Sequence, residues 1–433
     1  MKKTLLFVIY GGGHAHMVYP VVHALRASAA FIKGQLHIEV LGLPAAKYTL
    51  KVNGVECFGF VDYLRPDVDA DAIAWGKELA KAHHSPTVGI DLEDSIAYLG
   101  LCYKDIVTRL GEQEAAELFG RKARHAFYPL TIMERIFDDI KPDMVITSNS
   151  PRSEAAAIAT ASGHGIENLI MTDLFTGLGD YPLKARNITF INAFAKDMFV
   201  ADGLVDEQIS TCYYTGNPAF DRILTLPKEK DAAWMAAHFP QVVGRKTVLH
   251  ADMPAYWHTG KKCSHNKTEA EVIQELEACY DAALQAGAYY LIRPHPSQDR
   301  AFYAKWLENK RDASLAATCD LHELLRNIDV LIARTTTVGL EAAYLHKRIV
   351  QLDADFHADL PLAKMGIAWG VNSYADLPET LKNALSDDKK LEKIINQIKQ
   401  VLPDTPAAFS IARIILEKVG LADQESEKMW SVQ

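Results

Sequence analysis

Three threonines and a glutamate follow a short apolar segment near the C-terminal end of the chain. The apolar residues 330–333 have the length of a buried strand, and the alanine-rich segment that follows favours a helix. Thr335, Thr336 and Thr337 then lie at a helix start, where free backbone amides attract anions. One turn later, Glu341 is placed to accept hydrogen bonds from a vicinal diol. This pattern predicts a site for a phosphorylated ribose, although a capped helix with an exposed glutamate explains the same residues equally well.

A histidine follows the first apolar segment of the chain. Residues 11–13 are glycines that lead to His14, and the next helix is expected to start at Tyr19 and Pro20, because proline suits the first helical position. The glycines do not form G-x-G-x-x-G, so a dinucleotide site is not indicated. An imidazole at the end of a strand can act as a general base or orient a phosphate. The alternative is a loop histidine with no chemical role.

Two further segments end predicted strands in the second half of the chain. Arg293 and His295 stand in the sequence Arg-Pro-His-Pro, and the prolines fix the backbone on both sides of the imidazole. A rigid imidazole beside a guanidinium suits a pyrophosphate, although such turns also occur without a ligand. His250 is expected to line a phosphate and base pocket. His250, Asp252 and His258 are residue types that bind metal ions. Their spacing matches no standard zinc pattern, so no metal site is predicted.

Acidic residues before a long predicted helix offer another source of a base. Glu93 and Asp94 belong to the segment 89–95, but helix starts attract acids for electrostatic reasons alone. A structural role is therefore the favoured interpretation, and both residues stay candidates. Asp221 marks either a capped junction or a substrate contact. The segment 171–177 follows another strand of the first domain and is expected to line the acceptor side.

Strand-like apolar segments alternate with helix-like segments along nearly the whole chain. Near-continuous apolar strands separated by helices predict parallel sheets covered on both faces. The predicted fold class is α/β, with two Rossmann-like domains whose sheets face each other across a cleft that holds the ligands. The expected strands are residues 5–10, 36–42, 144–147, 168–171, 188–191, 212–215, 247–250, 289–292, 330–333 and 349–352.

A polar, proline-containing stretch at residues 224–231 separates the two predicted domains. We expect a first domain at 1–225 and a second at 226–405, both within the usual size range. Residues 406–433 are expected to form a helix that crosses back to the first domain, followed by a tail. The end of that tail, residues 423–428, is expected to fray.

The composition excludes several classes of protein. The chain has 433 residues, and its net charge of −9 argues against a nucleic-acid-binding surface. Six scattered cysteines without a C-x-x-C pair indicate reduced thiols in a cytosolic protein. The first apolar segment is too short for a signal peptide and lacks a cleavage site. No segment is long enough to span a bilayer, so a lipid-linked substrate is expected to be met at the membrane surface.

Four segments resemble the GT-B superfamily of glycosyltransferases. GGGHAHMVYPVVHALRA is similar to the start of the transferases that act on lipid I, whereas TGNPAFDRI, LIRPHP and DVLIARTTTVGLEAAYLHKRIVQLD are similar to bacterial capsule and surface-polysaccharide transferases. UDP-N-acetylglucosamine 2-epimerases share the same architecture. The glycine-rich segment departs from the lipid I enzymes, so their acceptor is not carried over to this chain.

The resemblance implies roles for the candidate residues. The second domain would hold a nucleotide-sugar donor, with Glu341 on the ribose and residues 335–337 along the pyrophosphate, near Arg293 and His295. The first domain would bind the acceptor, and His14 would act as the base. An acid of the 89–95 segment, Asp94 in particular, is the alternative base.

These inferences predict a glycosyltransferase of bacterial surface-polysaccharide synthesis. It is expected to be cytoplasmic, at the inner face of the cell membrane, and to need neither a metal nor a cofactor. Its partners would be a UDP-linked sugar donor and a glycan or glycolipid acceptor, with no nucleic acid. The alternatives are a UDP-N-acetylglucosamine 2-epimerase, a CDP-polyol phosphotransferase and a nucleotide-sugar-binding protein without activity.

Overall fold

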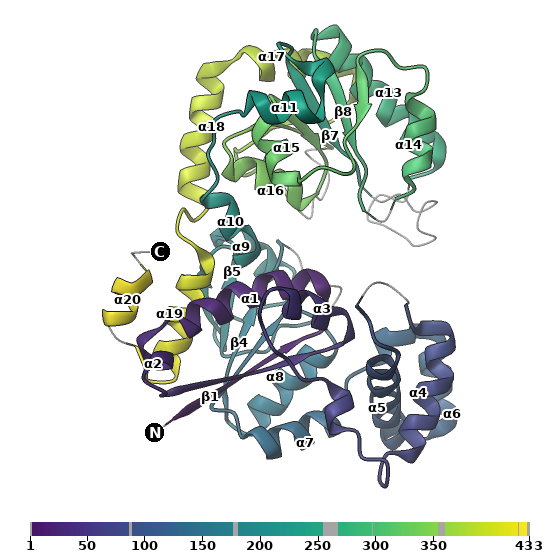
Figure 1. Cartoon of the computed structure of the whole chain (residues 1–433), viewed down its shortest axis with the longest axis vertical. Helices are drawn as coiled ribbons and strands as arrows, with labels where there is room; N and C mark the ends of the chain where they lie inside the picture. Colours follow the sequence, from purple (N-terminus) through teal and green to yellow (C-terminus); the bar gives the residue numbers. More distant parts are fainter. Residues whose placement is uncertain are drawn as a thin grey trace. The chain divides into compact units, whose positions relative to one another are not determined.

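The computed structural model describes residues 2–85, 89–175, 181–253, 267–296, 298–353, 360–422 and 424–430 (Figure 1). The chain divides into two compact units. Unit 1 consists of Met1–Asp221 together with Thr405–Gln433, and unit 2 consists of Arg222–Asp404. The chain therefore passes between the units twice, at residues 221–222 and 404–405.

Unit 1 is built on a parallel sheet with the strand order β2-β1-β3-β4-β5-β6. The chain leaves β1 toward β2 on one side and continues to β3 on the other, so the order reverses between β1 and β3. The strands are β1 Lys3–Ile9, β2 Leu36–Gly42, β3 Met144–Ser148, β4 Glu167–Met171, β5 Asn187–Phe190 and β6 Thr211–Tyr214.

Alternate residues of β1 enter two different hydrophobic cores, because successive side chains of a strand point to opposite faces. Leu5, Phe7 and Ile9 pack with α1 and the C-terminal helix α19, whereas Leu6 and Val8 pack with α5, α7 and α8. The helices of unit 1 are α1 Gly12–Arg26, α2 Ala29–Ile32, α3 Pro44–Val52, α4 Ala70–His83, α5 Leu92–Leu110, α6 Glu112–Lys122, α7 Leu130–Ile140, α8 Ser153–Gly163, α9 Ala193–Ala201, α19 Ala407–Lys418 and α20 Gln424–Trp430.

Unit 2 is built on a second parallel sheet, with the order β12-β11-β10-β7-β8-β9. The order reverses between β7 and β10. The strands are β7 Thr247–Ala251, β8 Tyr289–Arg293, β9 Ala313–Leu315, β10 Val330–Ala333, β11 Arg348–Leu352 and β12 Trp369–Val371. Its helices are α11 Ala232–His238, α13 Glu269–Gln285, α14 Arg300–Leu307, α15 Leu321–Asn327, α16 Thr337–Tyr344, α17 Leu377–Ser386 and α18 Asp388–Val401, and α10 Asp221–Leu224 joins the units.

The predicted fold class is confirmed, since both sheets are parallel and separated by helices. Two details of the prediction are wrong. The first helix begins at Gly12 rather than Tyr19, and Pro20 lies inside it. A β-carbon at Gly12 would stand 3.0 Å from the carbonyl oxygen of Ala45, so glycine permits the close approach of α1 to α3.

The second wrong detail is the expected fraying of residues 423–428: residues 424–428 lie in helix α20, and residue 423 lies outside the described residues. The Trp430 side chain at the end of this helix is buried, and its indole N–H donates a hydrogen bond to the carbonyl oxygen of Ala24 at 3.1 Å. The ring also stacks on Phe409. A buried aromatic anchor therefore holds the helix against unit 1.

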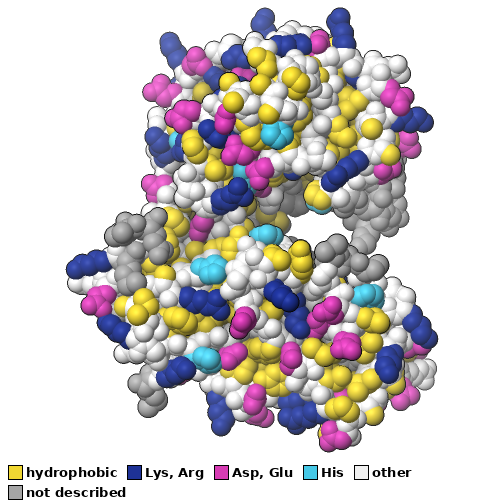
Figure 2. Space-filling view, viewed as in Figure 1, with side chains coloured by type: hydrophobic (Ala, Val, Ile, Leu, Met, Phe, Trp, Pro, Cys, Tyr) yellow, Lys and Arg dark blue, Asp and Glu magenta, His cyan; other side chains and the backbone are white. Residues whose placement is uncertain are grey.

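The surface carries charges of both signs. Figure 2 shows lysine and arginine side chains interspersed with aspartate and glutamate on the visible face of both units. Among the described residues, no helix combines the length and the apolar character needed to cross a bilayer.

Candidate active site

In unit 1, His14 lies at the point where the strand order reverses, which is where parallel α/β sheets bind ligands. It stands in the first turn of α1, just after β1. Its Nε2 lies 3.2 Å from Oδ2 of Asp173, which follows β4, and its Nδ1 lies 2.7 Å from Oγ of Ser148, the last residue of β3. Glu154, in the first turn of α8, accepts a hydrogen bond from the backbone N–H of Tyr10 at 2.8 Å.

Asp173 tunes the acid–base properties of His14. Burial lowers the pKa of His14, but the hydrogen bond and charge of Asp173, with the charge of Glu154, raise it above its usual 6.5. Burial conversely raises the pKa of Asp173, but the imidazole of His14 and the amide of Asn149 lower it. With Nε2–H directed at Asp173, the basic nitrogen of neutral His14 is Nδ1, which faces the Ser148 hydroxyl. The arrangement can accept and return a proton.

The two acidic candidates do not join this group. Asp94 is buried and forms an ion pair with Lys47 at 2.7 Å, which connects α5 to α3. Glu93 is exposed in the first turn of α5. The carboxylates whose charge acts on His14 are Asp173 and Glu154.

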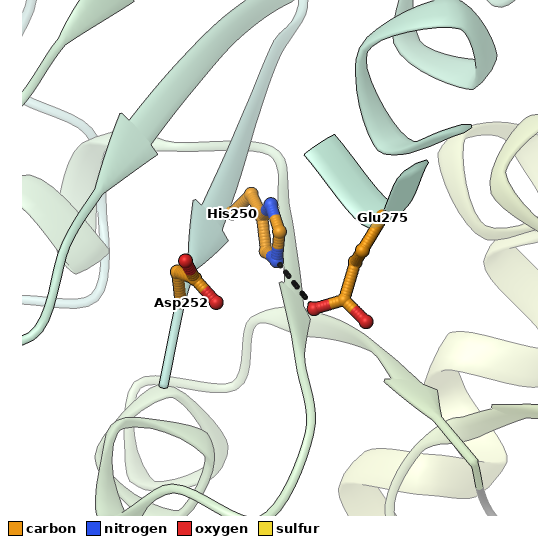
Figure 3. A group of neighbouring side chains, drawn as sticks. All are labelled: His250, Asp252 and Glu275. Carbon is orange, nitrogen blue, oxygen red and sulfur yellow. Dashed lines mark ion pairs between the residues drawn. The ribbon is translucent and has the colours of Figure 1, made fainter. Parts of the chain in front are cut away.

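In unit 2, His250 lies near the end of β7, beside the second reversal point. It is fully buried; its Nδ1 lies 2.7 Å from the Tyr290 hydroxyl and its Nε2 lies 3.7 Å from Oε1 of Glu275 (Figure 3). Burial lowers the pKa of His250, but Cys279, Glu275 and Asp252 outweigh this effect and raise it to about 10. The imidazole of His250 is therefore held between a hydroxyl and a carboxylate inside a buried polar network.

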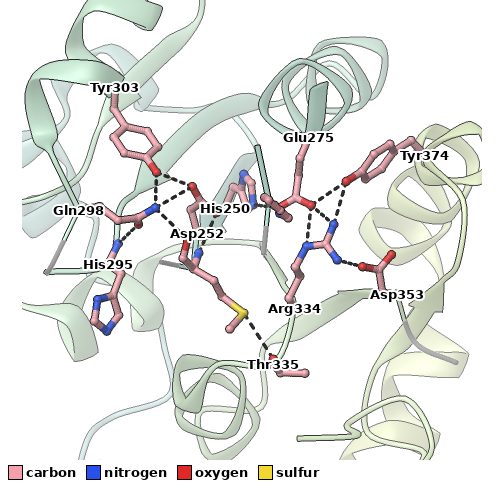
Figure 4. A network of polar contacts seen from close by, with 12 residues as sticks. His250, Asp252, Glu275, His295, Gln298, Tyr303, Arg334, Thr335, Asp353 and Tyr374 are labelled. Atoms are coloured by element: carbon pink, nitrogen blue, oxygen red, sulfur yellow. Dashed lines mark hydrogen bonds and ion pairs between the residues drawn. The ribbon is translucent and has the colours of Figure 1, made fainter. Parts of the chain in front are cut away.

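Glu275 of α13 is the centre of that network (Figure 4). One of its oxygens accepts hydrogen bonds from Arg334 Nε at 2.6 Å and from the Tyr374 hydroxyl at 2.8 Å. The other lies 2.7 Å from Lys267 Nζ. Arg334 also forms an ion pair with Asp353. The network fixes the guanidinium that immediately precedes the predicted Thr335 turn.

The ligand atoms of His250, Asp252 and Glu275 lie within 4.8 Å of one another, as three metal ligands would. However, the carboxylate of Asp252 accepts a hydrogen bond from the Tyr303 hydroxyl at 2.6 Å. The carboxylate of Glu275 is already neutralised by Arg334 and Lys267. A divalent cation would have to displace these groups, so the three residues do not fit a metal ion.

The predicted phosphate turn forms the start of helix α16. Thr336 is its N-cap, and its hydroxyl accepts a hydrogen bond from Val338 N–H at 3.4 Å. The Thr335 hydroxyl contacts the Met253 sulfur at 3.4 Å, and Thr337 is the first helical residue. A β-carbon at Gly339 would stand 2.4 Å from a methyl group of Leu362, so this glycine serves packing.

The remaining donor-site candidates are Glu341, inside helix α16, and Arg293 and His295, at the end of β8. Glu341 is buried, with one oxygen 2.8 Å from Nε2 of His322 in α15. Arg293 donates hydrogen bonds to the carbonyl oxygens of Ala316 and Cys319 at 2.9 and 3.0 Å, so its guanidinium holds the following loop. The imidazole of His295 is exposed and points away from the Asp252 network (Figure 4).

A polar cavity of about 510 Å³ opens beside the network of Glu275 and Arg334. It adjoins the carboxyl ends of β10, β11 and β12, and its size suits a small ligand. It is lined by charged and polar side chains, among them Lys267, Arg334, Asp353, Asn372, Ser373 and Tyr374.

Sequence reasoning missed several of these groups. Ser148 contacts His14, and Glu154 contacts Ser148. Glu275 pairs with His250, Tyr374 bonds to Glu275, and His322 pairs with Glu341. Ser148 and Glu154 carried a usable signal, because they flank the end of a predicted strand. The part of the predicted base pocket from Pro254 to Asn266, including His258, lies outside the described residues.

Comparison with known proteins adds the fold relationship. No protein-family profile and no curated protein sequence matches the chain. Among solved structures, the UDP-GlcNAc 2-epimerase of Neisseria meningitidis bound to UDP-GlcNAc superposes with a TM-score of 0.57, at 13% identity over 96% of this chain and 99% of the other.

Two glycosyltransferases superpose to a similar extent. The calicheamicin glycosyltransferase CalG4 has a TM-score of 0.53, at 13% identity over 97% of this chain and 98% of its own. A glycosyltransferase of Rickettsia africae has a TM-score of 0.54, at 10% identity over 96% and 99%. The chain thus has, over nearly its whole length, the GT-B fold found in both nucleotide-sugar epimerases and glycosyltransferases.

Proposed function

We propose that this protein is a glycosyltransferase that moves a sugar from a nucleotide-sugar donor to a hydroxyl of a glycan or glycolipid, in bacterial surface-polysaccharide synthesis. The observation that carries the proposal is the pairing of His14 with Asp173 at the reversal point of a sheet in a GT-B fold. A carboxylate-bound imidazole is the kind of base that an acceptor hydroxyl requires.

In the proposed reaction, His14 takes the proton of the acceptor hydroxyl. The acceptor oxygen forms a bond to the anomeric carbon, and the bond from that carbon to the diphosphate oxygen breaks. The amides at the start of α16 stabilise the departing nucleoside diphosphate, and Glu341 binds its ribose. The proposed mechanism assigns the stabilisation of the leaving group to these helix-start amides and invokes no metal.

A 2-epimerase is the second candidate, and a specific observation favours it. Three titratable side chains, His14, Glu154 and Asp173, converge on one reversal point. An epimerase needs several acids and bases around one sugar ring. Structures of 2-epimerases are also among those that superpose on this chain.

Proton NMR of the purified protein with UDP-GlcNAc alone distinguishes the two candidates. A transferase leaves the sugar configuration unchanged and releases UDP only with an acceptor or by slow hydrolysis, whereas an epimerase converts the sugar without an acceptor. The His14→Ala variant should abolish either turnover. His16→Ala is the matched control, because His16 is exposed on the same helix. Turnover that survives in His14→Ala would contradict the proposal.

A further inference from the structure

The turn between β3 and α8 holds an unusual concentration of buried polar groups without partners. Ser150 and Ser153 are 2% and 0% exposed, and neither hydroxyl has a hydrogen-bond partner among the described residues. The same holds for Oε2 of Glu154, which is 0% exposed, and for Nε of Arg152. Buried polar groups in folded proteins are almost always paired, so such a cluster needs an occupant.

The cluster also includes the free amides at the start of helix α8. The N-cap residue, Arg152, makes no side-chain capping bond, and α8 continues for 11 residues. The first amides of such a helix are donors without intrahelical partners. Donors and acceptors therefore occur together in one short segment, and Glu154 connects it to Ser148, whose hydroxyl lies 2.7 Å from Nδ1 of His14.

The charges select the chemistry of the occupant. Glu154 and Asp173 are acidic and would repel an anion, whereas Arg152 and the helix start would repel a cation. Oε2 of Glu154 needs a hydrogen-bond donor, and the helix amides need an acceptor. A hydroxyl group supplies both, and neighbouring hydroxyls on one ligand serve several of these groups at once.

We infer that Ser150, Ser153 and Glu154 form a binding subsite for a neutral polyhydroxylated group, a sugar or a polyol, at the start of α8 beside His14. The identification of this group as part of the acceptor rests on the proposed function. The binding of hydroxyl groups does not depend on any nucleotide. In the ligand-free fold these polar atoms are covered, so the ligand has to shift the 149–152 turn to reach them. The neighbouring side chains of His14 and Asp173 are already partly exposed.

The test measures ligand binding without a nucleotide. Saturation-transfer NMR titrations of the full chain use methyl glucoside, methyl N-acetylglucosaminide and glycerol as neutral probes and methyl phosphate as an anionic probe. Separate glycoside and glycerol arms distinguish a sugar from a polyol. We expect at least one neutral probe to bind, and the Ser150→Ala/Ser153→Ala double variant to bind it about tenfold more weakly, as the loss of hydrogen bonds implies.

Thr160→Val is the matched control, because the Thr160 hydroxyl is also buried without a hydrogen-bond partner in the described part of the chain and lies further along α8. It should bind the probes as the wild type does. The melting temperature of the double variant without ligand should be unchanged or higher, since its hydroxyls have no partner to lose.

Three results would overturn the inference. The first is the absence of saturation transfer to every neutral probe up to its solubility limit, which would leave internal water as the occupant. The second is neutral-probe affinity that the double substitution leaves unchanged or lowers less than it lowers the affinity for methyl phosphate. The third is a lowered melting temperature of the double variant, which would show that the hydroxyls bond within the fold. Because Ser150 and Ser153 both lie in unit 1, a probe that binds only at the α16 turn of unit 2 binds the wild type and the double variant equally.

Discussion

His14 acquires its proposed role from residues that are distant in the sequence. Asp173 is 159 positions away and Ser148 is 134 positions away, yet both contact the imidazole. The place of His14 in the sequence, directly after the first strand, was enough to predict it as a candidate. Its partners depend on β3 and β4 lying successively beside β1, and strand order is a property of the whole sheet.

The first prediction concerns the pH dependence of turnover. Because neutral His14 is the base, kcat/KM should rise with pH, with a midpoint above 6.5, where Asp173 holds the pKa of His14. Asp173→Asn removes the main group that raises this pKa while burial still lowers it. The midpoint should therefore move to lower pH, with a slower rate. A profile with an unchanged midpoint would show that Asp173 does not act on the catalytic base.

The second prediction concerns the buried charge of Glu275. Glu275→Gln removes the carboxylate paired with Lys267 and one of the two carboxylates paired with Arg334, and should cost about 3–5 kcal/mol of unfolding free energy in urea denaturation. Glu277→Gln, in the same helix, breaks a more exposed pair with Lys310 and should cost less than about 1 kcal/mol. Equal losses in the two variants would contradict a central role for Glu275.

At the scale of elements, the sequence predicts the long strands well and the short ones poorly. The ten expected strands are present with end points shifted by at most two residues, because each is a distinct apolar segment. The edge strands β9 and β12 span three residues each and are too short to give a periodic pattern. The early start of α1 was missed because its first two residues are glycines, whose low helix propensity is overridden by packing against α3.

The third prediction concerns the contact between helices α4 and α5. A β-carbon at Gly100 would stand 2.0 Å from the carbonyl oxygen of Ala72, so the two backbones touch through glycine. Gly100→Ala should force the helices apart and destabilise the protein by about 1–3 kcal/mol or more, as overpacking does.

Gly120→Ala is the control for this experiment. Gly120 lies inside α6 with no atom within 4 Å of an added β-carbon, so alanine should stabilise the helix by up to about 1 kcal/mol. Thermal or urea denaturation measures both variants. A neutral Gly100→Ala would show that α4 and α5 do not depend on this contact.

At the scale of the molecule, Asp221 ties the two points at which the chain passes between units. It ends the first segment of unit 1, and its two oxygens accept hydrogen bonds from the backbone N–H groups of Ala407 and Ala408 at 2.7 and 2.8 Å. The sequence left open whether Asp221 was a cap or a substrate contact. The geometry assigns it to the start of α19.

The fourth prediction follows from this cap. Asp221→Ala leaves two buried amides unpaired and should lower the unfolding free energy by about 1–3 kcal/mol, and Asp221→Asn, which keeps one acceptor, by less. Burial raises the pKa of Asp221 to about 6. The folded state thus holds this proton more tightly than the unfolded state, and the contribution of Asp221 to stability falls as pH rises from 3.8 to about 6. Asp221→Asn should remove this pH-dependent part of the unfolding free energy. Identical curves of stability against pH for the wild type and Asp221→Asn would contradict the prediction.

The measurement that tests the central claim most directly is calorimetric titration of UDP and UDP-GlcNAc into the wild type, Glu341→Ala and His322→Gln. The claim is that unit 2 holds a nucleotide on the α16 turn with Glu341 on its ribose. We expect the wild type to bind and Glu341→Ala to lose about 1.5–3 kcal/mol of binding free energy, the value of a charged hydrogen bond. His322→Gln, which keeps the carboxylate, should lose less. Unchanged nucleotide affinity in Glu341→Ala would contradict the account.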